Sequence, residues 1–231
     1  MNPNHVAMPN WLYSTEKRPI ALYRSQHALT KRERGPNDLP PILIMGGVHG
    51  DEPEGINLAS DTLNWLLERP METVLPWICI PCLNVDGAFH KTRVNGNKVD
   101  LNRNYPSKNW SPKYETERYH PGPKAASEIE IQGVVRVVSE YEPCVLIHCH
   151  SWHPCIVMTG APGRRFAEPL SRASGYELKE DIGYPTPGSL SQYGWHDLKI
   201  PVICIEEKEE SARAQTWMRF KPAIEEIFSK R

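Results

Sequence analysis

The chain has 231 residues, a formal net charge of -1 and a mean hydropathy of -0.53, with 27 basic and 28 acidic side chains. This balance gives no electrostatic basis for binding nucleic acid or an anionic membrane, and we expect neither partner. No stretch approaches the roughly 20 apolar residues of a membrane helix, and residues 1–11 lack the pattern of a signal peptide. The length fits a single domain, which we expect to be cytoplasmic.

The chain contains six cysteines, most of them inside apolar, strand-like runs rather than in loops. This placement favours buried free thiols in a reducing compartment over a disulfide framework. Cys79 and Cys82 form a CxxC pair, but residues three apart on a strand point to opposite faces. A metal or redox role for this pair is therefore not expected.

Residues 1–40 are interpreted as an N-terminal extension that packs on the main domain, with one strand around Ile20–Tyr23, and residues 41–231 as that domain. Short apolar runs in the main domain predict five strands, at Ile42–Met45, Trp77–Leu83, Cys144–Cys149, Cys155–Met158 and Val202–Ile205. Helical periodicity predicts four helices, at Pro53–Leu67, Ser127–Tyr141, Arg164–Ser174 and Ala212–Phe228. Residues 87–119 form a polar segment too long to be an idle connection.

Short strands that alternate with helices predict a single-domain α/β fold, with a mainly parallel or mixed sheet flanked by helices. In such sheets the carboxyl ends of the strands carry the functional site. Polar clusters follow four of the predicted strands: His49 with Glu52, the segment that begins at Asn84, His150, and Glu206. We therefore expect these side chains to meet along one edge of the sheet.

The first cluster, residues 46–52 (GGVHGDE), places His49 three residues before Glu52 at a strand-to-helix turn. Residues three apart share a helical face, so this imidazole and carboxylate can aim at one point. Two imidazoles and one carboxylate form a known catalytic zinc set whose fourth position is left for water. For this segment taken alone, a surface histidine beside a helix N-terminal glutamate is the alternative interpretation.

The second histidine of such a set has to come from elsewhere, and residues 147–153 (IHCHSWH) offer three candidates. His148 and His150 share one face of the predicted strand. His150 lies nearer the end of the strand, so it is favoured as the third ligand. For His148, a satisfied core histidine is favoured over a functional role.

The other two clusters supply charged groups. Arg93 and Arg103 lie in the polar segment, and each has a planar guanidinium suited to a carboxylate or a developing oxyanion. A solvated loop is the alternative interpretation there. Glu206 ends an apolar strand, where a carboxylate is costly without a role or a partner, and near a zinc ion it can serve as general base. Glu207 and its neighbours at 209 and 210 are interpreted as a solvated acidic stretch.

Five motifs together resemble the zinc carboxypeptidase superfamily, also called M14 or funnelins. They cover residues 42–206 in the order His49-Gly-Asp-Glu52, Asn84-Val-Asp-Gly87, Val99-Asp-Leu-Asn-Arg-Asn-Tyr105, His150-Ser-Trp152 and Cys204-Ile-Glu206. Within the superfamily, Ser127-Glu128, Cys155-Ile156 and residues 183–189 (GYPTPGS) resemble the murein-peptide amidases, which cleave the γ-D-glutamyl–diaminopimelate bond of cell-wall peptides. The resemblance implies a zinc-dependent peptidase or amidase that acts near a free carboxylate.

The resemblance also implies roles at the metal. His49, Glu52 and His150 would bind one zinc ion per chain, and Glu206 would act as the general base. Residues 41–231 would then be a zinc carboxypeptidase-like catalytic domain.

Four further residues acquire substrate roles by the same resemblance. Arg93 takes the position of the arginine that stabilises the oxyanion, and Asn102 and Arg103 take those that bind the terminal carboxylate. Tyr184 lies near the position of a mobile substrate-site tyrosine. Pancreatic-type enzymes carry arginine where this chain has Asp51, so a small cell-wall-derived peptide is expected as the substrate rather than an ordinary protein C-terminus.

Two other functions fit the same scaffold. One is a zinc deacylase of small N-acyl amino acids, like the succinylglutamate desuccinylase and aspartoacylase relatives. The other is a non-catalytic peptide-binding module. The Asn84 motif and the Tyr184 region favour a peptidase over a deacylase, and the retained Glu206 argues against a binder, which needs no poised base.

Overall fold

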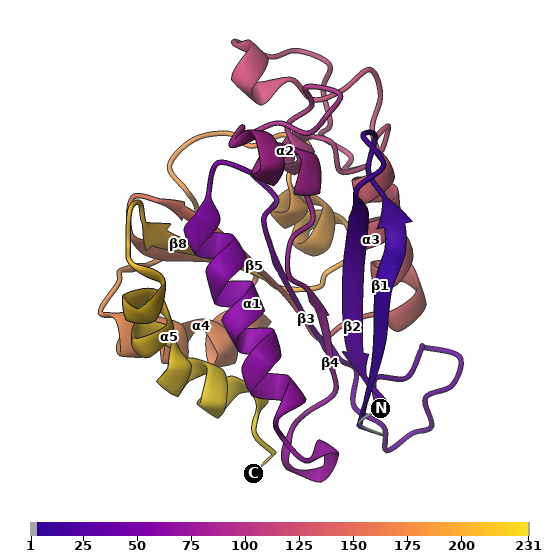
Figure 1. The fold of residues 1–231 in the computed structure, drawn as a ribbon, viewed down its shortest axis with the longest axis vertical. Helices are drawn as coiled ribbons and strands as arrows, with labels where there is room; N and C mark the ends of the chain where they lie inside the picture. The colour runs from indigo at the N-terminus through magenta and orange to yellow at the C-terminus, as the bar shows by residue number, and fades with distance from the viewer. Residues whose placement is uncertain (1–3, 231) are drawn as a thin grey trace.

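An eight-stranded β-sheet runs through the computed structural model, which describes residues 4–230 (Figure 1). The strands are His5–Tyr13 (β1), Pro19–Ser25 (β2), Ile42–Gly46 (β3), Trp77–Ile80 (β4), Val145–Trp152 (β5), Cys155–Thr159 (β6), Leu178–Lys179 (β7) and Val202–Lys208 (β8). Their order in the sheet is β1-β2-β4-β3-β5-β8-β6-β7. The central strands β4, β3, β5 and β8 are parallel, whereas β2 and β6 join them in antiparallel orientation.

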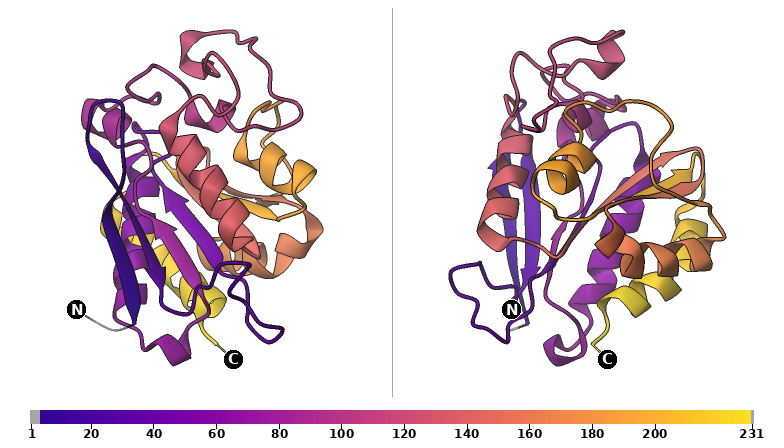
Figure 2. Two further views of the ribbon diagram at one scale, coloured as in Figure 1. Left: turned by 90° about the vertical axis from the view of Figure 1, so that its right-hand side faces the viewer. Right: turned by 180° about the vertical axis from the view of Figure 1, so that it is seen from behind.

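Helices lie on both sides of this sheet (Figures 1 and 2). The α-helices are Pro53–Leu67 (α1), Val85–His90 (α2), Ile129–Tyr141 (α3), Arg164–Ser174 (α4) and Arg213–Phe228 (α5). A π-helical turn spans Gln192–Asp197, and a short 3-10 turn spans Leu101–Arg103. Among residues 4–230, no helix has the length and apolar character needed to cross a membrane.

Each face of the sheet is covered by its own hydrophobic core. Strand β3 illustrates why, because its side chains alternate between the two sides. Ile42 and Ile44 pack in the core shared with α1, α4 and α5, while Leu43 and Met45 pack in the core shared with α3 and the β1–β2 hairpin. All five residues of β3 are buried. An uninterrupted apolar run is what a strand covered on both faces requires.

The predicted α/β fold is confirmed, and most predicted elements lie within a few residues of their expected bounds. Helices α1 and α4 begin and end where their periodicity predicts. In residues 1–40 the strand predicted around Ile20–Tyr23 is confirmed as part of β2, but a second strand, β1, pairs with it in antiparallel orientation within the main sheet. Strand β1 was missed because Pro9 and Asn10 interrupt its apolar pattern, and most of its residues are only partly buried at the sheet edge.

The pairing of β5 with β8 determines which side chains face the site. Their register places His150 opposite Glu206 and His148 opposite Cys204. Partners on adjacent strands share a face of the sheet, and so do residues two apart on one strand. Four chemically active side chains therefore lie on one patch near the carboxyl ends of two parallel strands. That is the edge where open α/β sheets carry their sites.

Candidate active site

The loop after β3 carries two of the site residues, and it folds back tightly on the start of α1. Gly47 adopts a φ of +61°, a left-handed conformation that favours glycine. At Gly50 an added Cβ would lie 1.9 Å from the carbonyl carbon of Gly87, so only glycine allows these two loops to touch. Glu52 then stands directly before Pro53 at the N-terminus of α1. This geometry turns Glu52 towards His49.

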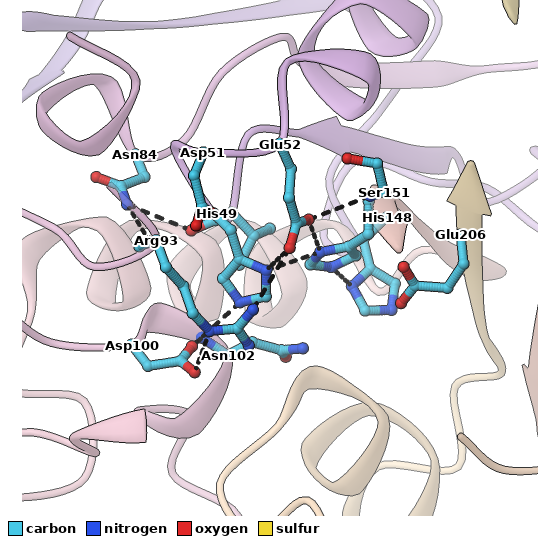
Figure 3. Close-up of polar contacts among 12 residues, drawn as sticks. His49, Asp51, Glu52, Asn84, Arg93, Asp100, Asn102, His148, Ser151 and Glu206 are labelled. Atoms are coloured by element: carbon cyan, nitrogen blue, oxygen red, sulfur yellow. Dashed lines mark hydrogen bonds and ion pairs between the residues drawn. The ribbon is translucent and has the colours of Figure 1, made fainter. Parts of the chain in front are cut away.

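Asn84 ties this loop to its neighbours (Figure 3). Its Oδ1 accepts a hydrogen bond from the amide of Gly87 at 2.8 Å, which caps α2. Its Nδ2 donates to the carbonyl of Arg93 at 3.0 Å and to that of Val48 at 3.5 Å. The motif that begins at Asn84 therefore fixes the relative positions of the His49 loop and the Arg93 loop.

Three candidate metal ligands converge at the edge of the sheet. Nδ1 of His49 lies 2.7 Å from one carboxylate oxygen of Glu52, and Nδ1 of His150 lies 2.7 Å from the other. The two Nδ1 atoms are 3.1 Å apart. Their ligand atoms all lie within 4.8 Å of one another, and all three residues are buried. Two nitrogens and one carboxylate oxygen that meet at a point match the donor set of a catalytic zinc site.

Charge reinforces this convergence. Burial alone would raise the pKa of Glu52, but the imidazoles of His49 and His150 hold it well below its usual range. The carboxylate is therefore ionised, as a metal ligand has to be. In both histidines Nδ1 faces the carboxylate of Glu52. Nε2 of each ring is therefore free to contact other parts of the protein.

Each histidine has a protein partner behind it. Nε2 of His49 lies 3.2 Å from Oδ1 of Asp100, whose pKa is lowered by Arg93 and His49 against the effect of burial. Nε2 of His150 lies 2.8 Å from Nδ1 of His148. Groups that hydrogen-bond the far nitrogen of a ligating histidine fix its tautomer and ring orientation. His148 is buried, as the satisfied core histidine that the sequence favours would be, but it contacts a candidate ligand and its Nε2 has no partner among the described residues.

Two arginines form the next wall of the site. Arg93 donates from Nε to Asp100 at 3.0 Å, and its Nη1 lies 3.4 Å from Glu52. Arg103 donates to the backbone carbonyl of Asn102 at 2.8 Å. Both guanidinium groups lie over the ring of Tyr119, at 5.3 Å and 5.4 Å from its centroid. One aromatic ring thus holds two permanent positive charges beside the metal ligands.

Asn102 is fixed by a contact from a distant part of the chain. The amide of Leu190 donates to its Oδ1 at 3.0 Å. This bond uses the oxygen of the side chain, so its amide nitrogen remains as the donor. Asn102 and Arg103 both line the cleft, and together they offer it donors that suit a carboxylate.

Glu206 lies on the neighbouring strand, directly opposite His150. It is 8% exposed, and the thiol of Cys204 donates to its Oε1 at 3.2 Å. Burial raises the pKa of Glu206. Figure 3 shows its carboxylate turned towards the histidines. A buried carboxylate with a raised pKa in a cleft has the properties of a general base.

Glu207 points the other way, which corrects the expectation of a solvated acidic stretch. It is fully buried, accepts from the hydroxyl of Tyr176 at 2.7 Å and forms an ion pair with Arg219. Successive strand residues alternate between faces, so Glu206 and Glu207 cannot share the site. Glu209 is exposed and lies at the edge of the site.

A cleft of about 310 Å³ opens above these residues. It is lined by all eight residues that the sequence singled out: His49, Glu52, Arg93, Asn102, Arg103, His150, Tyr184 and Glu206. Tyr184 is 43% exposed and meets Trp152 edge-on, with 6.0 Å between ring centroids. The sequence indicated no functional role for Asp100, Tyr119 or His148, since nothing in their local pattern shows which residues they contact.

The fold and the site together define the class of metal-dependent hydrolases. The zinc carboxypeptidase family, peptidase family M14, matches residues 1–167 of the chain. The chain therefore belongs to the zinc carboxypeptidase family, whose members depend on zinc.

Two curated relatives are similar over most of their length. Murein peptide amidase A of Escherichia coli K12 is 30% identical over 175 residues, which are 71% of this chain and 69% of the relative. Murein peptide amidase A of Vibrio campbellii is 28% identical over 176 residues, 71% of this chain and 68% of the relative.

Solved structures confirm the fold. Murein-tripeptide amidase from Escherichia coli O157 has a TM-score of 0.75 at 24% identity, over 100% of this chain and 94% of that one. Carboxypeptidase A from Helicoverpa armigera has a TM-score of 0.76 at 16% identity, over 97% and 69%.

Proposed function

We propose that the protein binds one zinc ion through His49, Glu52 and His150 and hydrolyses the γ-D-glutamyl–diaminopimelate bond of small cell-wall-derived peptides. The observation that carries the proposal is the convergence of these three side chains beside Glu206 on the adjacent strand. Arg103, which is buried, and Arg93, which is partly buried, line the same cleft. A binding module has no need of this arrangement.

Each group has a distinct task in the proposed reaction. When bound, zinc acts as a Lewis acid on the scissile carbonyl and on water. Glu206 takes a proton from the attacking water and delivers it to the leaving nitrogen, as a general base and then a general acid. Arg93 stabilises the negative charge that develops on the carbonyl oxygen.

Substrate position depends on the carboxylate next to the scissile bond. Asn102 and Arg103 offer adjacent donors, and a planar guanidinium can bind a carboxylate through two parallel hydrogen bonds. Tyr184 stands partly exposed at the cleft, where it can cover a bound peptide. A peptide bond near a free carboxylate is therefore the bond that this site can place against Glu206.

The choice of a cell-wall peptide is supported by the relatives, whose names describe amidases of murein peptides. Asp51 also lines the cleft, where it pairs with Arg118. We place the enzyme in the cytoplasm, where imported or recycled peptides are small. The six cysteines are all free, which suits a reducing compartment.

The test is hydrolysis of L-Ala-γ-D-Glu-meso-diaminopimelate by zinc-loaded protein, with release of free diaminopimelate followed by chromatography. Metal analysis should give about one zinc per chain. Chelation should abolish activity, and added zinc should restore it. The α-linked isomer of the tripeptide serves as the control for bond type. Lack of turnover by zinc-loaded protein would contradict the proposal.

The same assay separates the two other functions. Turnover of N-acyl amino acids with no turnover of the tripeptide would indicate a deacylase. Tight binding of the tripeptide with no hydrolysis, measured by calorimetry on zinc-loaded protein, would indicate a binding module.

A further inference from the structure

His148 carries a ring nitrogen that the proposed reaction does not use. The side chain is 2% exposed, and its ring lines the cleft. Its Nδ1 contacts His150, but its Nε2 is buried and has no hydrogen-bond partner among the described residues. Buried polar atoms are almost always paired, so an unpaired one next to a cleft requires an explanation. The carboxylate of Glu206 forms its hydrogen bond with Cys204, and among the described residues none links it to Nε2 of His148.

The tautomers of the two histidines follow from their contacts. Nδ1 of His150 faces the proposed zinc, so in the neutral ring the proton sits on Nε2. That proton can only be donated to Nδ1 of His148, 2.8 Å away. The proton of His148 is then on Nε2. The unpaired atom is therefore a donor, held in place by the metal ligand behind it.

One side of the cleft near this donor is apolar. Cys204 lies opposite His148 on β8, Val157 lies opposite Cys204 on β6, and Ile182 packs against the buried cluster that Val157 and Cys204 form with Cys155. Val157 and Cys204 also line the cleft. An aliphatic chain that ends in an oxygen fits such a pocket, because its methylene groups meet the apolar walls and its oxygen meets one N–H. A side chain whose only terminal group is an ammonium would place a donor against a donor.

We propose that Nε2 of His148 donates a hydrogen bond to an oxygen at the end of the substrate side chain, on the residue that carries the free carboxylate. His148 thereby selects side chains with a distal oxygen acceptor over those without one. The inference rests on the proposed function. Applied to cell-wall peptides, it selects diaminopimelate over lysine, since these two residues differ only by the distal carboxylate.

The first measurement compares kcat/KM on two matched tripeptides, L-Ala-γ-D-Glu-meso-diaminopimelate and L-Ala-γ-D-Glu-L-Lys. A site built to bond a substrate group rejects the analogue that lacks it. We expect the wild type to prefer diaminopimelate by roughly 10–100-fold, as for a hydrogen bond to a charged group. A second series compares N-acylated dipeptides that end in Glu or Gln with those that end in Leu or Met.

Two variants test the roles of the two ring nitrogens of His148 separately. In His148→Asn the side-chain oxygen lies near the position of Nδ1, so the contact with His150 is kept and the donor at the Nε2 position is lost. In His148→Gln the amide nitrogen lies near the position of Nε2, so the donor is kept. We expect His148→Asn to lose the preference with its zinc content unchanged. We expect His148→Gln to retain much of it.

Binding provides a readout that does not depend on turnover. The same peptide pairs are titrated calorimetrically into Glu206→Gln protein, with and without His148→Asn. The ratio of Kd values should fall by the same factor as the ratio of kcat/KM. Nitrogen NMR of the metal-loaded protein should find the proton of His148 on Nε2.

The outcomes distinguish this inference from the proposed function. If neither tripeptide is cleaved but the dipeptides show a preference for oxygen-bearing side chains that depends on His148, the cell-wall substrate is wrong and the inference stands. If the preference is unchanged in His148→Asn, or absent from both series in turnover and in binding, the inference is overturned.

Discussion

Oδ1 of Asp100 lies 3.2 Å from Nε2 of His49, on the ring edge opposite the one that faces Glu52 and His150. The same carboxylate accepts from Arg93 through its other oxygen. Asp100 thus orients both His49, a candidate metal ligand, and the guanidinium of Arg93. It does not contact the proposed metal position, and it is buried from solvent.

Asp100→Asn should weaken zinc binding by roughly 10–100-fold, as other losses of such supporting carboxylates do. The amide can no longer accept charge-assisted bonds at both oxygens, so the orientation of His49 is less fixed. Competition with a chromogenic chelator measures the affinity. Asp51→Asn is the matched control, because it removes one negative charge from the same cleft without touching a ligand. Equal zinc affinity in both variants would contradict the role of Asp100.

Glu206→Gln should lower kcat by roughly 10²–10⁴-fold or more while zinc content and fold stay intact. Glutamine keeps the size of the side chain and can hydrogen-bond, but it cannot take the proton from water. Activity on the tripeptide and metal content are measured on the same protein sample. Glu207→Gln is the control, and it should alter stability rather than turnover, because Glu207 bonds Tyr176 and Arg219 on the opposite face. Activity of Glu206→Gln within a few-fold of wild type would exclude it as the base.

Arg103→Lys should raise KM although the charge is kept. The lysine ammonium cannot form two parallel bonds to a carboxylate, and it also loses the planar contact with Tyr119. The expected loss is about 1–3 kcal/mol of binding free energy. Steady-state kinetics on the tripeptide measure it. Arg118→Lys, an exposed substitution in the same cleft, should leave KM nearly unchanged. If KM is unaltered in Arg103→Lys, this residue does not bind the carboxylate.

Glu130 links stability to pH. Burial raises its pKa to about 7, helped by the nearby Glu128. In the unfolded chain a glutamate has a pKa of about 4.3. Between these values the folded state binds more protons than the unfolded state, so the free energy of unfolding falls as pH rises towards 7.

Glu130→Gln removes this ionisation and should stabilise the protein on the order of 1–3 kcal/mol at pH 8, with a much smaller gain at pH 4.5. Urea denaturation at both pH values measures the difference. Glu140→Gln lies on the same helix, α3, but is exposed, so its effect should not depend on pH in this way. A gain that is equal at both pH values would show that folding does not raise the pKa of Glu130.

Much of the fold was predictable because its information is local. Helices α1 and α4 match their predicted bounds since amphipathic periodicity, Pro53 at one start and Gly175 at one end are all visible in short windows. The central strands are continuous apolar runs for the same reason. Strand β7, with two residues, and the π-helical turn at Gln192–Asp197 have no such pattern. Neither was predicted.

The candidate ligands could also be proposed from the sequence, because His49 and Glu52 are three residues apart and each polar cluster follows a strand. The residues behind them could not. Asp100 lies 51 positions from His49, and Asn102 is fixed by Leu190, 88 positions away. No local spacing encodes such contacts, since they exist only after the loops have packed on the sheet.

The sequence by itself thus determined the class of fold, the order of its main elements and the chemical types available at the edge of the sheet. Only the tertiary structure determined which of these side chains lie next to one another. The register of β5 against β8 placed Glu206 opposite His150 and turned Glu207 to the far face. It also placed Cys204 opposite His148. Side-chain period along a strand is local, but register is a property of two paired strands, and a shift of one residue would reverse every one of these assignments.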